Sequence, residues 1–444
     1  MPRLFGTDGI RGVANADLTP EFTVGLGRAL VRTLREEGHA RPHIVVGRDP
    51  RASGEMLEAA LVAGITSAGG NVTAMGVVPT PAVAYLTVDQ GAQSGAMISA
   101  SHNPVPDNGI KFFGPDGYKL TDAEEDRVEE LLQRFYDDRP VGDGIGRLRA
   151  RPDLVEHYID HLAATVREDV TRLRIVVDCA NGSASTVGPE LFRRLGCDVV
   201  AINAEPDGLN INDGCGSTYP EVMAAAVMEH GADLGLAHDG DADRLIAADH
   251  TGAVVDGDTI LAILAERAHR EGGLDTVVTT VMTNMGFKRA MSGLGIDVVE
   301  TRVGDRYVLE AMREGGHPIG GEQSGHVILL DHATTGDGVL TAAQLVATVA
   351  GSGRDLADLA TVMRRLPQVL VNVRDVDRGR LDDATTLWRA VDEEERALDG
   401  AGRILVRASG TEPLVRVMVE ADSEARATEI AERLAKVVSA ELAA

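Results

Sequence analysis

Short apolar runs that are typical of strands alternate with longer amphipathic segments along most of this chain. An apolar run at 43–46 follows a helix-like segment that begins at Thr19-Pro20 and ends near Gly38, and a second such segment covers 53–69. A threonine can cap a helix and a proline fits its first turn, so this boundary is a good helix start. The alternation constrains the chain to helices layered on sheets, which is an α/β fold.

The pattern divides into four domains, one more than the about three that 444 residues suggest at roughly 150 residues each. We place them at 1–150, 151–254, 255–366 and 367–444, with a linker at 142–152. The later strands are expected at 174–178, 198–202 and 233–237, at 277–282 and 297–302, and at 369–373, 404–406 and 415–419. Helices are expected after Gly257 and from Ser423 onward, and Thr121 with Glu124 predicts a capping box.

Charge and composition exclude several classes of protein. The formal net charge of −26 argues against a nucleic-acid or anionic membrane partner. No apolar run approaches the roughly 18 residues of a membrane span, and the first residues show no secretion signal. The three cysteines are an odd number, which is typical of reduced thiols, so we expect a cytoplasmic protein.

A serine in a predicted turn is the first candidate for chemistry. Ser101 follows an apolar strand at 96–98, and Asn103-Pro104 and the residues at 107–109 are strong turn formers. Lys111 would then lie in the turn after this serine. A serine hydrolase is poorly supported, because no Gly-x-Ser-x-Gly motif is present. An ordinary turn at the end of a strand remains the alternative.

Three aspartates at alternating positions are the sharper signal. Asp239, Asp241 and Asp243 follow the predicted strand at 233–237, at the edge of a sheet where ligands bind. Their oxygens can converge on one hard cation such as Mg²⁺. An EF-hand is excluded, because Arg244 and His250 stand where that loop needs glycine and glutamate. A hydroxyl and a bound cation together would suit phosphoryl transfer, whereas a solvated acidic turn is the alternative.

Two Gly-rich loops add possible ligand contacts. The loop at 320–326 offers a carboxylate, an amide and a hydroxyl, which suits sugar hydroxyls, although a polar hairpin tip would look alike. The loop at 407–413, with Arg416, combines guanidinium groups, hydroxyls and a glycine turn. These groups can cradle a phosphate, and an exposed basic turn is the alternative. No motif for a nucleotide cofactor is present.

Lysine is rare in this chain. Only four of the 43 basic residues are lysines, at 111, 119, 288 and 436. Arginine does not give up its proton in proteins, whereas lysine can. We therefore single out Lys111, ten residues after Ser101, as a candidate for proton transfer.

Taken in order, these motifs resemble those of the α-D-phosphohexomutases over essentially the whole chain. The matching segments are 5–12, 47–51, 98–104, 107–113, 239–244, 321–326, 333–338 and 407–413. The resemblance implies three similar mixed α/β domains and a smaller C-terminal α+β domain around a central cleft. It also implies an intramolecular phosphotransferase whose Ser101 must be phosphorylated for activity and which holds one Mg²⁺ per chain.

The resemblance assigns roles to individual residues. The implied catalytic residues are Ser101, Lys111, Arg11 and His102, and the implied metal ligands are Asp239, Asp241, Asp243 and phospho-Ser101. The implied substrate-binding residues are Glu322, Gln323, Ser324, Arg244, Arg407, Ser409, Gly410, Thr411 and Arg416. Lys111 and Arg11 would assist proton transfer, and the last five residues would bind the distal phosphate.

Gln323 is similar to the glutamine in the branch of the family that acts on glucosamine phosphates. We therefore expect interconversion of glucosamine 6-phosphate and glucosamine 1-phosphate through a bisphosphorylated sugar, for amino-sugar nucleotide and cell-wall precursor synthesis. Mannose or glucose phosphates are the nearest alternative substrates. A non-catalytic sugar-phosphate or metal-binding protein is the alternative from another class, and both a monomer and a homodimer remain open.

Overall fold

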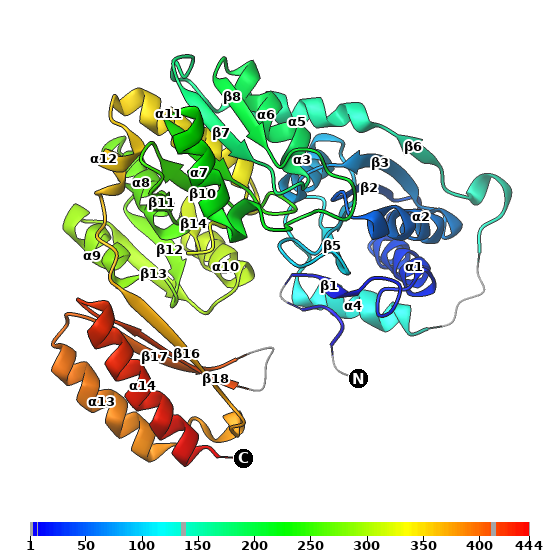
Figure 1. Cartoon of the computed structure of the whole chain (residues 1–444). Helices are drawn as coiled ribbons and strands as arrows, with labels where there is room; N and C mark the ends of the chain where they lie inside the picture. The colour runs from blue at the N-terminus through cyan, green and yellow to red at the C-terminus, as the bar shows by residue number, and fades with distance from the viewer. Residues whose placement is uncertain (1–2, 7, 135–138, 410–413, 444) are drawn as a thin grey trace. The chain divides into compact units, whose positions relative to one another are not determined.

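Four β-sheets follow one another along the chain. The computed structural model describes residues 3–6, 8–134, 139–409 and 414–443 (Figure 1). The described residues form sheets of six, five, four and three strands, in agreement with the predicted α/β fold of four domains. They pack into two compact units, one within 1–281 and 296–361 and the other within 282–295 and 362–444, and each unit is described by itself.

The first sheet has the strand order β1(Ile10–Val13), β5(Asp107–Phe113), β4(Ser94–Ile98), β2(His43–Arg48), β3(Asn71–Val77) and β6(Leu148–Ala150). Its helices are α1(Pro20–Glu36), α2(Ala52–Ser67), α3(Thr80–Asp89) and α4(Asp122–Leu132). Ile44 and Val46 of β2 share a buried core with α1 and α2. Gly47, on the opposite face, lies so close to Val83 of α3 that a Cβ there would meet its side chain at 2.7 Å. Helices therefore cover both faces of this sheet.

The second and third sheets, with the helices named below, complete the first unit. The second has the order β11(Val254–Val255), β10(Ile246–Asp249), β9(Leu234–Ala237), β7(Arg174–Asp178) and β8(Asp198–Ile202), with helices α5(Val155–Ala164), α6(Ala184–Arg194) and α7(Pro220–His230). The third has the order β13(Asp297–Thr301), β12(Thr276–Thr280), β14(Ile319–Gly321) and β15(Val327–Leu329), with helices α8(Gly257–Arg270), α10(Asp305–Gly315), α11(Gly338–Ser352) and α12(Leu356–Ala360).

The second unit is built on the antiparallel sheet β16(Gln368–Arg374), β18(Leu414–Glu420) and β17(Arg403–Ala408). Helices α13(Thr385–Leu398) and α14(Glu424–Glu441) pack on it, with Leu387 and Leu434 in the shared core. Helix α9(Met285–Leu294) belongs to this unit, because the Met285 N–H donates to the Glu420 carboxylate at 2.8 Å. Short 3₁₀ turns occur at Gly142–Gly144, Pro152–Leu154, Gly216–Thr218 and Arg378–Arg380.

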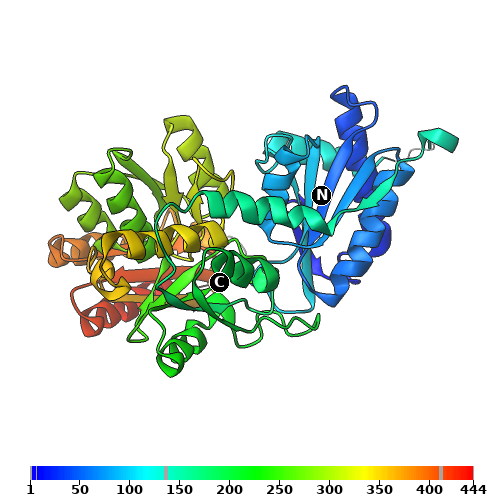
Figure 2. The same cartoon turned by 90° about the horizontal axis from the view of Figure 1, so that it is seen from above.

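Helix α5 links the parts of the first unit. It packs against α3, α6 and α11, and Figure 2 shows it crossing between the first domain and the rest of the unit. The buried Tyr158 hydroxyl of α5 lies 2.9 and 2.8 Å from the two carboxylate oxygens of Asp337. Asp337 in turn caps α11 by accepting the Leu340 N–H at 2.8 Å. One carboxylate thus orders a helix start and ties it to α5.

Most predicted boundaries of helices and strands agree with the structure. Thr19 caps α1, and Thr121 with Glu124 forms the capping box of α4. The turn predicted at 107–109 is wrong, because these residues belong to β5 and pair with β1. Gly109 permits this close packing, since a Cβ there would lie 2.5 Å from the Ser99 carbonyl oxygen. Lys111 therefore projects from a central strand and not from a turn.

Two smaller expectations also change. The predicted linker at 142–152 contains β6, which pairs with β3 and extends the first sheet. The strand expected at 277–282 ends at Thr280, and the segment Met282–Gly295 that follows belongs to the second unit. Local sequence could not show either result, because both depend on distant partners.

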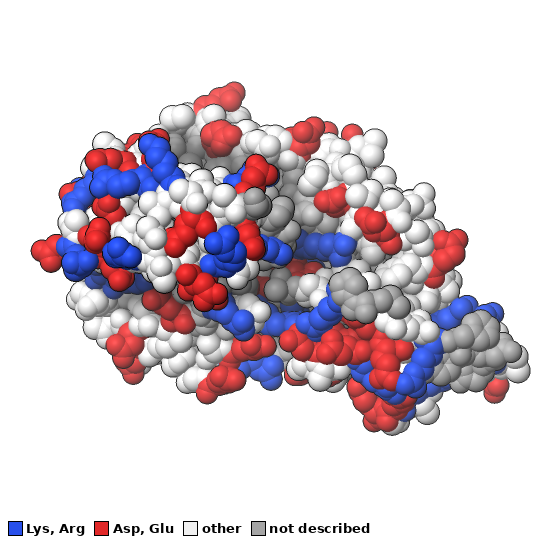
Figure 3. All heavy atoms as spheres, turned by 90° about the horizontal axis from the view of Figure 1, so that it is seen from below, with Lys and Arg blue, Asp and Glu red and all other residues white. Residues whose placement is uncertain are grey.

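Charge is spread widely over the protein. On the face in Figure 3, acidic side chains are distributed over the surface with basic side chains among them. Across the part of the chain that the structure describes, no helix is long and apolar enough to cross a membrane.

We expect Tyr158→Phe to destabilise the first unit. The change removes the hydroxyl that donates to the buried Asp337 carboxylate, which should cost about 1–3 kcal/mol. The measurement is thermal unfolding followed by circular dichroism. Tyr219→Phe is the matched control, because Tyr219 is 44% exposed. Equal unfolding temperatures for the two variants would contradict this role of Tyr158.

Candidate active site

The loop after β4 holds Ser101 in an unusual backbone conformation. Ser101 has φ of +52° and is almost fully buried. Its N–H donates to Ser99 Oγ at 2.9 Å, and the Ser99 hydroxyl donates to Asp49 Oδ2 at 2.6 Å. A non-glycine residue in the left-handed region is strained, and it persists only where its surroundings hold it. The loop is therefore built to present this one side chain.

Arg51 provides much of that support. Its guanidinium donates to the backbone carbonyls of Ser101, Asn103 and Pro104 at 2.9, 2.7 and 2.6 Å. The same group pairs with Asp49 at 2.9 Å, and both side chains are fully buried. Sequence reasoning missed this pair as functional, although both residues lie in the 47–51 motif. Asp49 and Arg51 together hold the serine loop in place.

The second domain contacts the same loop from another side. Asn212 Nδ2 donates to the Ser101 carbonyl oxygen at 3.0 Å. Gly240 approaches that oxygen so closely that a Cβ would lie 2.6 Å from it. A glycine is therefore required where the acidic loop meets the serine loop.

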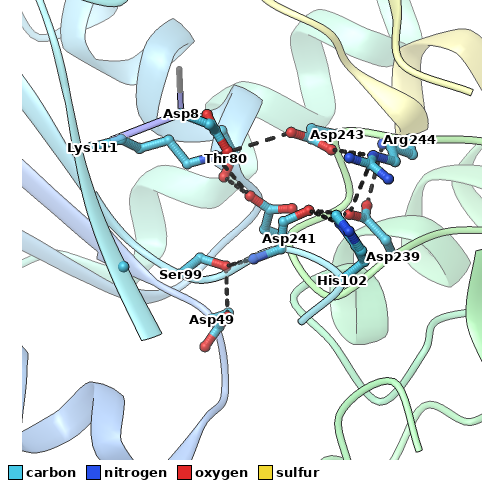
Figure 4. A network of polar contacts seen from close by, with 12 residues as sticks. Asp8, Asp49, Thr80, Ser99, His102, Lys111, Asp239, Asp241, Asp243 and Arg244 are labelled. Carbon is cyan, nitrogen blue, oxygen red and sulfur yellow. Dashed lines mark hydrogen bonds and ion pairs between the residues drawn. The ribbon is translucent and has the colours of Figure 1, made fainter. Parts of the chain in front are cut away.

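The acidic loop follows β9 and brings three carboxylates together. Asp239, Asp241 and Asp243 are buried, and one oxygen from each lies within 4.8 Å of the others. The Ser101 hydroxyl donates to Asp239 Oδ2 at 2.6 Å. Asp241 is held by Thr80, whose hydroxyl donates to its Oδ2 at 2.5 Å. The structure thus places the serine beside the triplet. Figure 4 shows the three aspartates.

The donor set fits a hard divalent cation. Among the described residues, Asp241 Oδ1 and Asp243 Oδ1 are buried and make no hydrogen bond. Burial and the charges of Asp243 and Asp241 raise the pKa of Asp239 to about 8. A group of buried carboxylates is costly without positive charge, and oxygen ligands suit Mg²⁺. These three residues could therefore hold a metal ion.

Lys111 is the nearest cation to the triplet. Its ammonium lies 3.0 Å from Asp241 Oδ2, 3.3 Å from Asp8 Oδ2 and 4.0 Å from Asp243 Oδ2 (Figure 4). Burial alone would lower the pKa of Lys111, but Asp241, Asp8 and Asp243 reverse that effect and raise it. Lys111 is only 3% exposed on its side chain, so its charge acts at close range on the site.

Arg11 and His102 flank these groups. Arg11 forms an ion pair with Asp8, the carboxylate that also contacts Lys111. His102 Nδ1 lies 3.3 Å from the Ser101 hydroxyl oxygen. Burial, followed by Arg244 and Arg11, lowers the pKa of His102 to about 4, so a neutral imidazole faces the serine.

Arg244 lies at the end of the acidic loop. Its Nε is 4.0 Å from Asp239 Oδ2 and 3.8 Å from Asp243 Oδ1. The Arg244 N–H also donates to Asp239 Oδ1 at 3.3 Å. This guanidinium adds positive charge beside the triplet, where an anionic ligand would need it.

Residues 322–326 form the tip of the hairpin of β14 and β15, and such a hairpin tip is the alternative that the residue pattern left open to a sugar-binding loop. Glu322 accepts the Gly304 N–H at 3.1 Å, and its own N–H donates to the His326 carbonyl at 2.9 Å. Gln323 and Ser324 follow at the tip, where Ser324 is exposed. A carboxylate, an amide and a hydroxyl thus lie on one tight turn.

His326 is a residue that sequence reasoning left without a role. Its Nδ1 lies 3.6 Å from Asp243 Oδ2, and its Nε2 lies 3.8 Å from Asp305 Oδ2. Burial would lower the pKa of His326, but Asp243 and Asp305 raise it to about 9. His326 therefore carries a positive charge next to the triplet. Its place in the 321–326 motif was the available signal.

The predicted phosphate-binding residues lie in the second unit. Arg407 of β17 stands directly opposite Arg416 of β18. Burial, and then the neighbouring charge of Arg416, lowers the pKa of Arg407. The Ser409 carbonyl accepts a hydrogen bond from Arg378 at 2.7 Å. Gly410 and Thr411 lie outside the described residues. Two adjacent guanidiniums form a local cationic site on an acidic protein, which suits a phosphate.

Comparison with known proteins decides the family. Four family models match the chain in order, and together they cover most of it. They are the phosphoglucomutase/phosphomannomutase alpha/beta/alpha domains I at 2–137, II at 156–252 and III at 256–366, and the C-terminal domain at 370–437. This chain belongs to the phosphoglucomutase/phosphomannomutase family. It is therefore a phosphohexomutase, an isomerase, as the motifs predicted.

Individual relatives agree with this assignment. The chain is 58% identical over 451 residues to the phosphoglucosamine mutase of Streptomyces coelicolor and 57% identical over 452 residues to that of Streptomyces avermitilis, with all of each chain covered. A solved phosphoglucomutase/phosphomannomutase family protein from Burkholderia thailandensis superposes with a TM-score of 0.84 and 26% identity, over 99% of this chain and 97% of that chain.

The first unit of this phosphohexomutase brings half of the predicted site residues into one network. Hydrogen bonds and ion pairs connect the predicted residues Ser101, His102, Arg11, Lys111, Asp239, Asp241, Asp243 and Arg244. Burial raises the pKa of Glu322, and the nearby charges of His326 and Arg244 partly oppose that rise. The predicted Glu322 therefore lies near the charges of this network. Arg407, Ser409 and Arg416 belong to the second unit, which is described by itself.

We expect Arg51→Lys to lower kcat about 10-fold or more, because a displaced serine loop misplaces the reacting hydroxyl. The substitution keeps a positive charge beside Asp49 but cannot reproduce three bonds from one planar guanidinium. Steady-state kinetics and thermal unfolding check this. Arg48→Lys is the control. Arg48 is the last residue of β2, three positions before Arg51, and it contacts Glu58 at 2.9 Å and not the serine loop. Similar kcat values for the two variants would contradict the role of Arg51.

Proposed function

We propose that this phosphohexomutase interconverts glucosamine 6-phosphate and glucosamine 1-phosphate. The observation that carries the proposal is the Ser101 hydroxyl, held 2.6 Å from a buried aspartate of a triplet that could hold a metal ion. The two Streptomyces relatives named phosphoglucosamine mutase, at 57% and 58% identity over the full chain, support glucosamine phosphate as the substrate.

In the proposed reaction, phospho-Ser101 gives its phosphoryl group to a free hydroxyl of the sugar phosphate. The Ser101 Oγ–P bond breaks and a new O–P bond forms on the sugar. The sugar hydroxyl loses its proton, and Ser101 Oγ gains one to become a hydroxyl again. The resulting bisphosphorylated sugar reorients in the site, so that its other phosphoryl group faces Ser101 and is transferred back to it. A carrier that is regenerated in each cycle needs no phosphate donor between turnovers.

Mg²⁺, held by Asp239, Asp241, Asp243 and an oxygen of phospho-Ser101, would neutralise charge on the transferring group when bound. Lys111 and Arg11 share Asp8, and we propose that they assist proton transfer beside the serine. The neutral His102 imidazole, 3.3 Å from Ser101 Oγ, is placed to accept or donate a hydrogen bond there.

The remaining predicted residues would bind the sugar phosphate. Glu322, Gln323 and Ser324 offer hydrogen-bonding groups that suit sugar hydroxyls and the amino group. Arg244 places a cation next to the triplet. The distal phosphate would bind the residues of the second unit, Arg407, Ser409, Gly410, Thr411 and Arg416. We also propose a cytoplasmic location, since all three cysteines are unpaired.

The test compares glucosamine, glucose and mannose 6-phosphates as substrates of the purified protein. We expect glucosamine 6-phosphate to have the highest kcat/KM, and intact-mass spectrometry to show one phosphoryl group on the wild type. Ser101→Ala should lose that mass and nearly all turnover, because the carrier oxygen is gone. A higher kcat/KM for glucose or mannose 6-phosphate would instead favour a phosphoglucomutase or phosphomannomutase. Substantial turnover by Ser101→Ala would overturn the phosphoserine mechanism.

We expect a chelator to abolish turnover and added Mg²⁺ to restore it. Asp241→Asn should weaken metal binding, because it removes one negative charge from a site that depends on hard anionic oxygens. The measurement is activity against Mg²⁺ concentration, together with calorimetric titration of Mg²⁺. Asp213→Asn, an exposed change on a nearby loop, is the control. Full activity in excess chelator would show that the triplet has a structural role only.

A further inference from the structure

Six charged side chains of alternating sign form a closed ring in the first unit. In order they are Lys111, Asp8, Lys119, Asp305, His326 and Asp243, and then Lys111 again. We name this set the charge ring. Its members come from the first sheet and its loops, from the acidic loop and from the third domain. Figure 4 shows the side with Asp8, Lys111 and Asp243.

Every neighbouring pair in the charge ring is within ion-pair distance. Lys111 Nζ lies 3.3 Å from Asp8 Oδ2, and Lys119 Nζ lies 2.5 Å from Asp8 Oδ1. Lys119 also forms an ion pair with Asp305. His326 completes the ring at 3.8 Å from Asp305 and 3.6 Å from Asp243. Each charge therefore has an opposite charge on both sides.

Lys119 is the member that joins the first domain to the third. Its backbone forms a bridge with Phe113, at the end of the strand that carries Lys111. Its side chain is only 8% exposed and extends between the carboxylates of Asp8 and Asp305. Removal of this ammonium would leave two largely buried carboxylates without their shared partner.

The two carboxylates face opposite halves of the site. Asp8 contacts Lys111 and Arg11, the pair proposed to act next to the serine. Asp305 is the first residue of α10, where the helix N-terminus favours a negative charge. It follows Gly304, whose N–H binds the Glu322 carboxylate of the sugar loop. Lys119 thus contacts Asp8, which holds the Lys111–Arg11 pair, and Asp305, which lies next to the residue that binds Glu322.

We propose that Lys119 is a positioning residue, and that through Asp8 and Asp305 it aligns the Lys111–Arg11 pair with the Glu322 loop. The inference rests on the proposed mutase function and adds a residue to it that has no direct role in the chemistry. It also gives a reason for a second lysine in a chain rich in arginine. A compact ammonium fits between two close carboxylates, whereas a planar guanidinium needs more room and a fixed geometry.

The test is a double-mutant cycle of Lys119→Met and Asp305→Asn. We expect Lys119→Met to lower kcat and raise KM, because both halves of the site lose their alignment, with kcat/KM lower by about 10-fold or more. The double variant should have a kcat/KM close to that of the worse single variant, since a neutral pair leaves no unbalanced charge between the domains. Such non-additivity is the signature of two residues that act as a unit.

Controls separate positioning from simple stabilisation. Lys436→Met makes the same change at an exposed lysine of α14 and should keep wild-type kinetics. Kinetics are measured well below the unfolding temperature of each variant, where a purely structural loss would leave kcat and KM unchanged. If Lys119→Met does not fold, Lys119→Arg replaces it, and we expect a folded protein with reduced kcat/KM.

Any of three results would overturn the inference. Folded Lys119→Met could keep kcat and KM within about twofold of the wild type, or the losses in the cycle could be fully additive. Where Lys119→Arg is the variant used, normal kinetics of that variant would be the third such result. Failure of the proposed function looks different. In that case the wild type itself would not interconvert the glucosamine phosphates, whereas failure of the inference alone leaves an active wild type and equally active variants.

Discussion

The concentration of negative charge at the acidic loop is the constraint on which the rest of the site depends. Three buried aspartates offer oxygens within 4.8 Å of one another, and the Ser101 hydroxyl donates a hydrogen bond to one of them, Asp239. Buried like charges are unfavourable unless cations approach them. Lys111, His326 and Arg244 all lie within 4 Å of these carboxylates, so the surrounding elements are arranged to supply positive charge and to leave oxygens for a metal ion.

A second constraint is the strained serine loop. A positive φ at Ser101 is stable only because Asp49 and Arg51 hold the loop, and because Gly240 lets the acidic loop come close. Ser101 and the acidic triplet are therefore positioned by each other's backbone as much as by their side chains. This arrangement explains why the 47–51 motif, which has no obvious chemistry, belongs to the site.

Sequence patterns predicted the α/β class and the sites of most strands correctly, because periodicity, caps and turn residues are local properties. The chemical roles of Ser101 and the aspartates stay predictions. The patterns were wrong at 107–109, where good turn formers lie in a central strand that pairs with β1. Here tertiary pairing outweighs local preference. The same error placed Lys111 in a turn, whereas its position on β5 is what directs its ammonium between Asp8 and Asp241.

By itself, the sequence determined the family, and it predicted Ser101 as a candidate phosphoryl carrier and the aspartates as candidate ligands of a cation, since these predictions follow from residue types and their spacing. Tertiary structure alone decided that Arg51 supports the serine loop and that His326 and Lys119 join the network around the triplet. The contacts from Arg51 to Ser101, from His326 to Asp243 and from Lys119 to Asp305 each span 50 or more positions of the chain. Such contacts depend on how the sheets pack, and no local pattern of residues records that packing.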